Sequence, residues 1–260
     1  MPKLSISPKA IVFDLWYTLI CPEHHRPHGQ GSITAIPAAL GLDPKPFANY
    51  WESQLPAMYR HPRLMRDYVA DYLSTFGRTL TEAERVAFDN VWSAHDSALA
   101  LPRPQVQVHL TNIVEGAIRL GLLSNAHERE IRHWSASPLS AHFSAARFSC
   151  NIGCAKPERA AYCHVLDALG VAAEDAMFVG DGASNELQGA RDAGFGAVVF
   201  MRGLLKELRM RESEFSNLAS ISDAVVDDIA EIPALFSIDG GTKSVGRLTT
   251  GRSRRAKTRG

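Results

Sequence analysis

The sequence predicts an α/β protein in which a doubly wound parallel sheet carries an inserted all-helical segment. Short apolar runs over residues 10–14, 118–124 and 177–180 have the length of buried strands. These runs alternate with stretches of helical spacing, which is typical of a parallel sheet covered on both faces. Helical spacing also runs without a strand pattern through residues 21–104, between the first two strands. We therefore expect one α/β core and one helical insertion.

The remaining core elements follow the same alternation along the chain. Further strands are expected at residues 148–150, 196–200 and 223–226, and helices at 106–119, 128–134, 157–169 and 185–191, with a last one ending at 235. The helix at 157–169 has a proline at its start and Gly170 just after its end, which are typical boundary residues.

Within the insertion, helices are expected over residues 44–59 and 64–76, and a third from Thr81, where Glu82 and Glu84 supply an acidic first turn. Apolar and aromatic side chains recur at helical spacing in all three. We interpret them as packing residues of a small separate core.

Polar side chains stand where the predicted core strands end. Asp14 follows the first strand, Ser124 ends the second and Asp181 follows the third, with Lys156 in the loop before the helix at 157–169. Ligands of open parallel sheets bind beyond the carboxyl ends of the strands. Two carboxylates, a hydroxyl and an ammonium group provide a nucleophile, a site for a divalent cation and groups that neutralise phosphate oxygens. The set favours phosphoryl transfer.

The order of these four motifs resembles that of the haloacid dehalogenase-like hydrolase superfamily, and the resemblance spans about residues 8–235. It implies a Rossmann-like core from residues 1–20 and 105–238 and a helical cap from residues 21–104 that covers the site and selects the substrate. Residues 239–260, beyond the resemblance, are expected to form a basic tail. The implied substrate is a small phosphorylated metabolite.

The resemblance also implies a role for each site residue. Asp14 is the candidate nucleophile that forms an aspartyl phosphate, and Mg²⁺ is expected between Asp14, the backbone carbonyl of Trp16 and Asp181. Glu186 is expected to support the metal or to pair with Lys156. The candidates for binding phosphate are Thr18, Ser124, Asn125 and Lys156.

Trp16 departs from the pattern of the family's phosphatases, which carry a second aspartate two residues after the nucleophile as general acid and base. An indole has no proton to exchange near neutral pH, and general acid–base catalysis typically contributes about 10²–10⁴-fold. Dehalogenating relatives carry an aromatic residue here but lack the Gly-Asp motif that this chain has at 180–181. The alternatives are therefore a metal-independent 2-haloacid dehalogenase-like hydrolase, or a weakened protein that binds a phosphorylated ligand.

One further segment could supply the missing acid. His24, His25, Arg26 and His28 follow the nucleophile strand closely. They could bind substrate and exchange protons, or form a solvated hinge between core and cap.

Composition is that of a soluble globular protein, with 45% hydrophobic and 22% charged residues. No apolar run is long enough for a membrane span, and no secretory signal is visible, so we expect a cytoplasmic protein, monomeric or homodimeric, with no membrane partner. The four cysteines are expected to be reduced thiols; a zinc site from Cys150, Cys154 and His164 is the alternative.

Charge is distributed unevenly along the chain. Residues 241–260 hold seven of the 28 basic residues and no acid, which leaves 21 basic against 28 acidic residues in the body. We interpret this tail as a disordered, solvated extension rather than a nucleic-acid contact.

Overall fold

The structure, a computed structural model, describes residues 3–26, 31–209 and 212–236. The predicted basic tail at 239–260 lies outside these residues. Six parallel strands form one sheet in the order β3-β2-β1-β4-β5-β6. The strands are β1 (Ala10–Phe13), β2 (Arg119–Ser124), β3 (Ala145–Phe148), β4 (Ala176–Gly180), β5 (Ala197–Met201) and β6 (Ala224–Val226). The predicted parallel α/β fold is confirmed.

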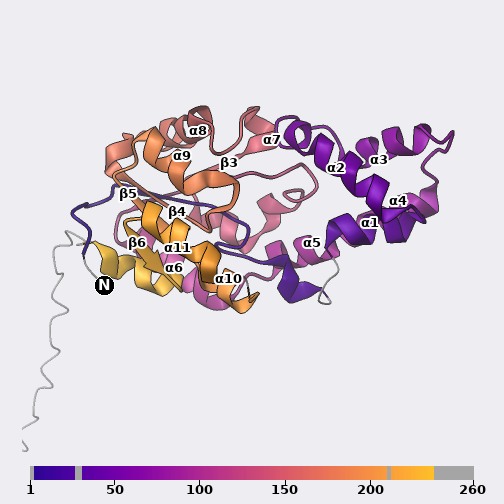
Figure 1. Cartoon of the computed structure of the whole chain (residues 1–260). Helices are drawn as coiled ribbons and strands as arrows, with labels where there is room; N and C mark the ends of the chain where they lie inside the picture. The colour runs from indigo at the N-terminus through magenta and orange to yellow at the C-terminus, as the bar shows by residue number, and fades with distance from the viewer. Residues whose placement is uncertain (1–2, 27–30, 210–211, 237–260) are drawn as a thin grey trace, which may run out of the picture.

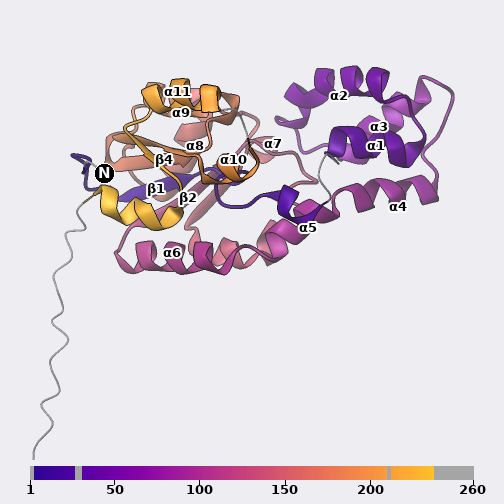
Figure 2. The same ribbon diagram turned by 60° about the horizontal axis from the view of Figure 1, so that its bottom comes forward.

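Helices cover both faces of this sheet (Figures 1 and 2). The core helices are α6 (Pro104–Glu115), α7 (Ser149–Ile152), α8 (Arg159–Leu169), α9 (Glu186–Ala193), α10 (Gly203–Glu207) and α11 (Glu212–Ile221). Short 3₁₀ helices are η2 (Trp134–Ala136), η3 (Pro138–His142), η4 (Ala173–Asp175), η5 (Ala183–Asn185) and η6 (Ile229–Leu235). Side chains of β1 alternate between the two faces: Ile11 and Phe13 pack with α6 and η6, and Val12 packs with α8 and α9.

Beside the sheet lies a second group of helices, whose side chains form a core of their own (Figure 1). These are α1 (Ser32–Leu40), α2 (Pro44–Met58), α3 (Met65–Ser74) and α4 (Glu82–Val91). Thr81 begins α4 with a capping box, because its hydroxyl accepts from the amide of Glu84 while the Glu84 carboxylate accepts from the amide of Thr81. The 3₁₀ helix η1 (Pro22–His25) and α5 (Ser93–Ala100) connect this group to the sheet.

Three local predictions were wrong at their ends or in their type. Residues 128–133 form turns and a bend rather than a helix, and Trp134 begins η2, because the side chains of Arg129 and Glu130 point into tertiary contacts with α5. Ser149 and Cys150 belong to α7 rather than to a strand; the Ser149 hydroxyl bonds the backbone of Ala126, 3.0 Å from its nitrogen. Helix α8 begins at Arg159, two residues later than predicted, with Glu158 as its N-cap.

No helix of the described residues is both long and apolar enough to cross a membrane. All four cysteines are free thiols, as predicted.

Candidate active site

Strand β1 delivers Asp14 to the carboxyl edge of the sheet. The Asp14 amide donates to the carbonyl of Val179 at 2.9 Å, so its backbone is still held by β4 although the strand has ended. Its carboxylate is buried, and Oδ2 accepts a hydrogen bond from the Thr18 hydroxyl at 3.1 Å. Thr18, predicted to contact phosphate, thus orients the Asp14 carboxylate.

Strand β4 ends in a glycine turn that carries the other two acids. The Asp181 carboxylate accepts from the amide of Ala183 at 2.9 Å, and Glu186 Oε1 accepts from the amide of Gly182 at 3.0 Å. A Cβ atom on Gly180 would lie 2.0 Å from Glu186 Oε1. The absence of a side chain at Gly180 therefore leaves the space that the Glu186 carboxylate occupies.

Lys156 joins the two sides of the site. Its ammonium Nζ lies 2.6 Å from Asp14 Oδ1 and 2.5 Å from Glu186 Oε2, and the side chain is almost fully buried. Burial lowers the pKa of Lys156, but the carboxylates of Asp14 and Glu186 outweigh it and the net effect is a raised pKa. The Asn125 carboxamide bonds the Lys156 backbone twice: its Nδ2 donates to the Lys156 carbonyl oxygen and its Oδ1 accepts from the Lys156 amide, both at 2.8 Å. The Asn125 carboxamide, predicted to contact phosphate, therefore positions Lys156.

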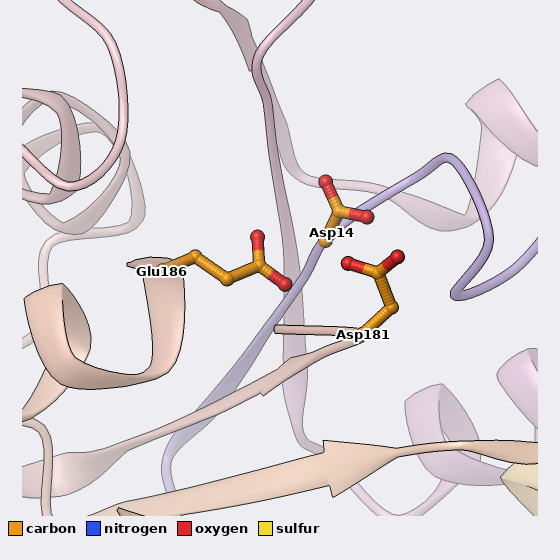
Figure 3. A group of neighbouring side chains, drawn as sticks. All are labelled: Asp14, Asp181 and Glu186. Carbon is orange, nitrogen blue, oxygen red and sulfur yellow. The ribbon is translucent and has the colours of Figure 1, made fainter. Parts of the chain in front are cut away.

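The three carboxylates point toward one another from three different elements (Figure 3). One oxygen each of Asp14, Asp181 and Glu186 lie within 4.8 Å of one another, and all three residues are buried. Burial, together with the charge of Asp14, raises the pKa of Asp181 to about 6. Burial also raises the pKa of Glu186. Among the described residues no second group of this kind includes Cys150 or Cys154, so the alternative zinc site is not formed.

Ser124 supplies the hydroxyl. It ends β2 next to β1 and is 1% exposed, yet its Oγ has no hydrogen-bond partner among the described residues. A buried polar group without a partner carries a desolvation cost. The hydroxyl lines the same cavity as Asp14 and Lys156, where a ligand oxygen can accept a hydrogen bond from it.

This cavity has a volume of about 150 Å³. It contains Asp14, Ser124, Asn125, Lys156, Asp181 and Glu186, together with Trp16, Tyr17, Pro22, Tyr59, His95, Glu130, Ala183 and Ser184. The sequence pattern did not indicate Tyr59, His95 or Glu130 as site residues. The available signals were weak: a histidine in a helix of small residues, and a carboxylate six residues after Ser124.

Part of the cavity lining is aromatic, with Trp16, Tyr59 and His95 among its residues. The rings of Trp16 and His95 meet edge to face at 5.1 Å, and Trp92 packs on His95 at the same centroid distance. Burial lowers the pKa of His95 to about 4, so its imidazole is neutral near pH 7. Neither Trp16 Nε1 nor His95 Nδ1 has a hydrogen-bond partner in the part of the chain that the structure describes.

His24 and His25, the two described histidines near the nucleophile strand, do not line this cavity. His24 lies 3.2 Å from Glu207 and 3.1 Å from Arg103, outside the site, and His25 is exposed. His28 lies outside the described residues. The predicted substitution of the missing acid by His24 or His25 therefore finds no support in the geometry.

The fold is thus a parallel α/β sheet with buried carboxylates and a lysine at its carboxyl edge. A sequence model of the haloacid dehalogenase-like hydrolase family matches residues 8–194. The chain belongs to this family.

One curated relative is a phosphatase. A phosphoserine phosphatase of Thermus thermophilus is 33% identical over 105 residues, which is 40% of this chain and 42% of the relative. The chain thus matches less than half the length of that relative.

Solved structures show the shared fold. The L-2-haloacid dehalogenase of Xanthobacter autotrophicus is 21% identical, with 88% of this chain and 98% of that chain covered and a TM-score of 0.54. An HAD phosphatase of Thermococcus onnurineus is 15% identical, with coverages of 87% and 96% and a TM-score of 0.59. One fold therefore serves both chemistries.

Proposed function

We propose that this protein is a Mg²⁺-dependent hydrolase of a small phosphorylated metabolite, with Asp14 as nucleophile. The observation that carries the proposal is the buried cluster of three carboxylates around one lysine, on the carboxyl edge of the sheet. Three buried acids with one ammonium group leave an excess of negative charge, which a hard cation would balance.

The donor set fits such a cation. The oxygens of Asp14 and Asp181 lie close enough to share an ion, and the pKa of Asp181, raised to about 6, reflects a carboxylate whose charge is poorly compensated. In the proposal Asp14, Asp181 and the backbone carbonyl of Trp16 hold Mg²⁺, and Glu186 supports the site. When bound, the ion supplies charge neutralisation for phosphate oxygens.

The chain's own residues divide the remaining work. Asp14, held by Thr18 and Lys156, attacks phosphorus through a carboxylate oxygen and forms an aspartyl phosphate that water later hydrolyses. The unpartnered Ser124 hydroxyl donates to a phosphate oxygen. Lys156 neutralises charge on the transferring group. Helices α1–α4 serve as the cap; Tyr59, which follows α2, brings this region to the cavity.

A second candidate is a metal-independent hydrolase of a 2-haloacid. Trp16 favours it, because a halide leaves without a proton and needs no acid at that position. Solved relatives of this fold include a dehalogenase described with chloropropionic acid covalently bound. The match to a phosphoserine phosphatase and the carboxylate cluster support the phosphatase more strongly. Binding of a phosphorylated ligand without turnover is the third candidate.

A single set of assays separates the three. The pure protein is tested on a panel of phosphate esters and on 2-chloropropionate, each with Mg²⁺ and with a chelator. Phosphate release that needs Mg²⁺ supports the proposal, and chelator-independent chloride release supports the dehalogenase. Thermal stabilisation by a phosphate ester without turnover indicates a binding protein.

The nucleophile is tested by Asp14→Asn, with Asp175→Asn as the matched control. Asp175 also pairs with a lysine, Lys9, but lies at the surface. We expect the first variant to lose activity and the second to retain it. Mass spectrometry of acid-quenched protein should find a phosphoryl group on Asp14; turnover by Asp14→Asn at the wild-type rate would exclude this nucleophile.

A further inference from the structure

The cavity holds one carboxyl group that the proposed mechanism does not use. Glu130 lies in the turn after β2 and lines the same cavity as Asp14. Its Oε2 accepts from the backbone amide of His127 at 3.2 Å, and its Oε1 lies 3.9 Å from His95 Nε2. The side chain is 16% exposed and pairs with no lysine or arginine among the described residues.

Its surroundings keep this carboxyl group protonated. Burial raises the pKa of Glu130 to about 8, although the amide of His127 and the charge of Arg26 act in the opposite direction. The two neighbouring histidines do not compensate its charge, because burial lowers the pKa of both His95 and His127 and leaves them neutral. The titratable groups that face Glu130 are His95 of α5, His127 of its own turn, Arg26 after η1, Tyr59 after α2 and Cys150 of α7.

An alkyl phosphate needs such a group. Its leaving oxygen departs as a strongly basic alkoxide unless a proton arrives as the bond to phosphorus breaks. The indole of Trp16 does not supply one. Burial raises the pKa of the phenols of Tyr17 and Tyr59 far above neutrality, and Lys156 and Glu186 hold each other in an ion pair. Glu130 remains as an acid that is protonated at neutral pH and faces the cavity.

We propose that Glu130 is the catalytic acid and base of this site, an inference that rests on the proposed phosphatase function. As Asp14 forms its bond to phosphorus and the bond from phosphorus to the leaving oxygen breaks, the carboxyl proton of Glu130 passes to that oxygen. The Glu130 carboxylate then takes a proton from a water molecule. The water oxygen attacks phosphorus, the bond to Asp14 breaks, and phosphate, free Asp14 and protonated Glu130 result.

The leaving group separates this role from a structural one. Nitrophenolate leaves without a proton near neutral pH, whereas the serine alkoxide does not. For Glu130→Gln we expect kcat on O-phosphoserine, or on the best alkyl phosphate of the panel, to fall about 10²–10⁴-fold. On p-nitrophenyl phosphate the loss should be at least tenfold smaller than on the alkyl phosphate. Rate on the alkyl phosphate should fall in the wild type as pH rises through about 8, where Glu130 loses its proton, and this limb should be absent in Glu130→Gln.

Two further variants show whether a loss of activity comes from the missing carboxyl group or from misfolding. Glu130→Asp keeps a carboxyl group and should recover part of the alkyl phosphate activity and the pH limb. Glu128→Gln is the matched control. Glu128 lies in the same turn but lines a different cavity, between α3, α4 and this turn, and its Oε1 accepts a hydrogen bond from the amide of Met65. Its activity on both esters should stay within about twofold of wild type, because glutamine keeps an oxygen that can accept the same bond from Met65.

The outcomes distinguish the inference from the function on which it rests. Equal losses on both esters in folded Glu130→Gln, or no loss on either, would overturn the role of Glu130 while the phosphatase stands. A wild-type protein that hydrolyses neither ester removes the proposed function, and the inference with it.

Discussion

Among the described residues, Lys156 is the only lysine or arginine that pairs with the carboxylate cluster, and its replacement by methionine tests how the site is held together. Methionine keeps the apolar stem and removes the charge that lies 2.6 Å from Asp14 and 2.5 Å from Glu186. Removing one partner of a buried ion pair costs about 3–5 kcal/mol, because the remaining charges are left uncompensated. We expect Lys156→Met to lower the free energy of unfolding by this amount at pH 7.5 without metal.

The matched control is Lys9→Met. Lys9 makes an ion pair of nearly the same length, 2.7 Å to Asp175, but its side chain is 63% exposed. Exposed pairs contribute about 0–1 kcal/mol. The two variants therefore differ mainly in burial, and urea denaturation of both proteins in a chelating buffer measures the difference.

The loss of unfolding free energy in Lys156→Met should be larger at higher pH. Burial and the charge of Asp14 already hold the pKa of Asp181 at about 6, above its ordinary value of 3.8. The folded state therefore keeps a proton that the unfolded state releases, and stability from this group falls as pH rises through that window. Without the Lys156 charge the pKa of Asp181 should rise further. The loss of unfolding free energy in Lys156→Met should therefore become smaller as the pH is lowered from 7.5 to 5.5. A loss of stability no larger than that of Lys9→Met, or one that is constant over this range, would show that the Lys156 charge does not stabilise the cluster.

Three other predictions follow from the described contacts. Mg²⁺ at 100 times its dissociation constant should raise the free energy of unfolding by about 2.7 kcal/mol, and Asp181→Asn should remove the shift; an equal shift in both proteins would place the ion elsewhere. Arg129→Met should lower the free energy of unfolding by about 2 kcal/mol in urea denaturation, because the buried guanidinium donates to both Asp96 oxygens at 2.7 and 2.8 Å while the aspartate stays partly exposed. An unchanged free energy of unfolding would mean that the pair is not stabilising. Gly189→Ala should cost about 1–3 kcal/mol by the same measurement, since a Cβ would lie 2.5 Å from the Tyr162 hydroxyl; an unchanged midpoint would show that α9 shifts freely.

Much of the fold could be predicted because it depends on local pattern. Short apolar runs bounded by glycine and polar residues predict strands such as β1 and β4, and their alternation with helices predicts a parallel sheet. The sheet in turn places residues that follow its strands on one edge, which is why Asp14, Ser124 and Asp181 could be selected as site candidates from their positions alone.

Contacts between distant segments decided the rest. Residues 128–134 have helical spacing, but the turn that replaces the helix aims Glu130 into the cavity and Arg129 at Asp96. His95 comes to the site because α5 packs against Trp16, a contact that no local pattern encodes.

Local patterns in the sequence account for the sheet, the helical insertion and the order of the acids, because periodicity and turn chemistry act over a few residues. Long-range contacts determine which groups share the cavity, Asp14 and Glu130 among them, and they place Thr18 and Asn125 where they hold Asp14 and Lys156. The physical reason is that burial and charge, which set the pKa of each acid, depend on neighbours far away in the chain.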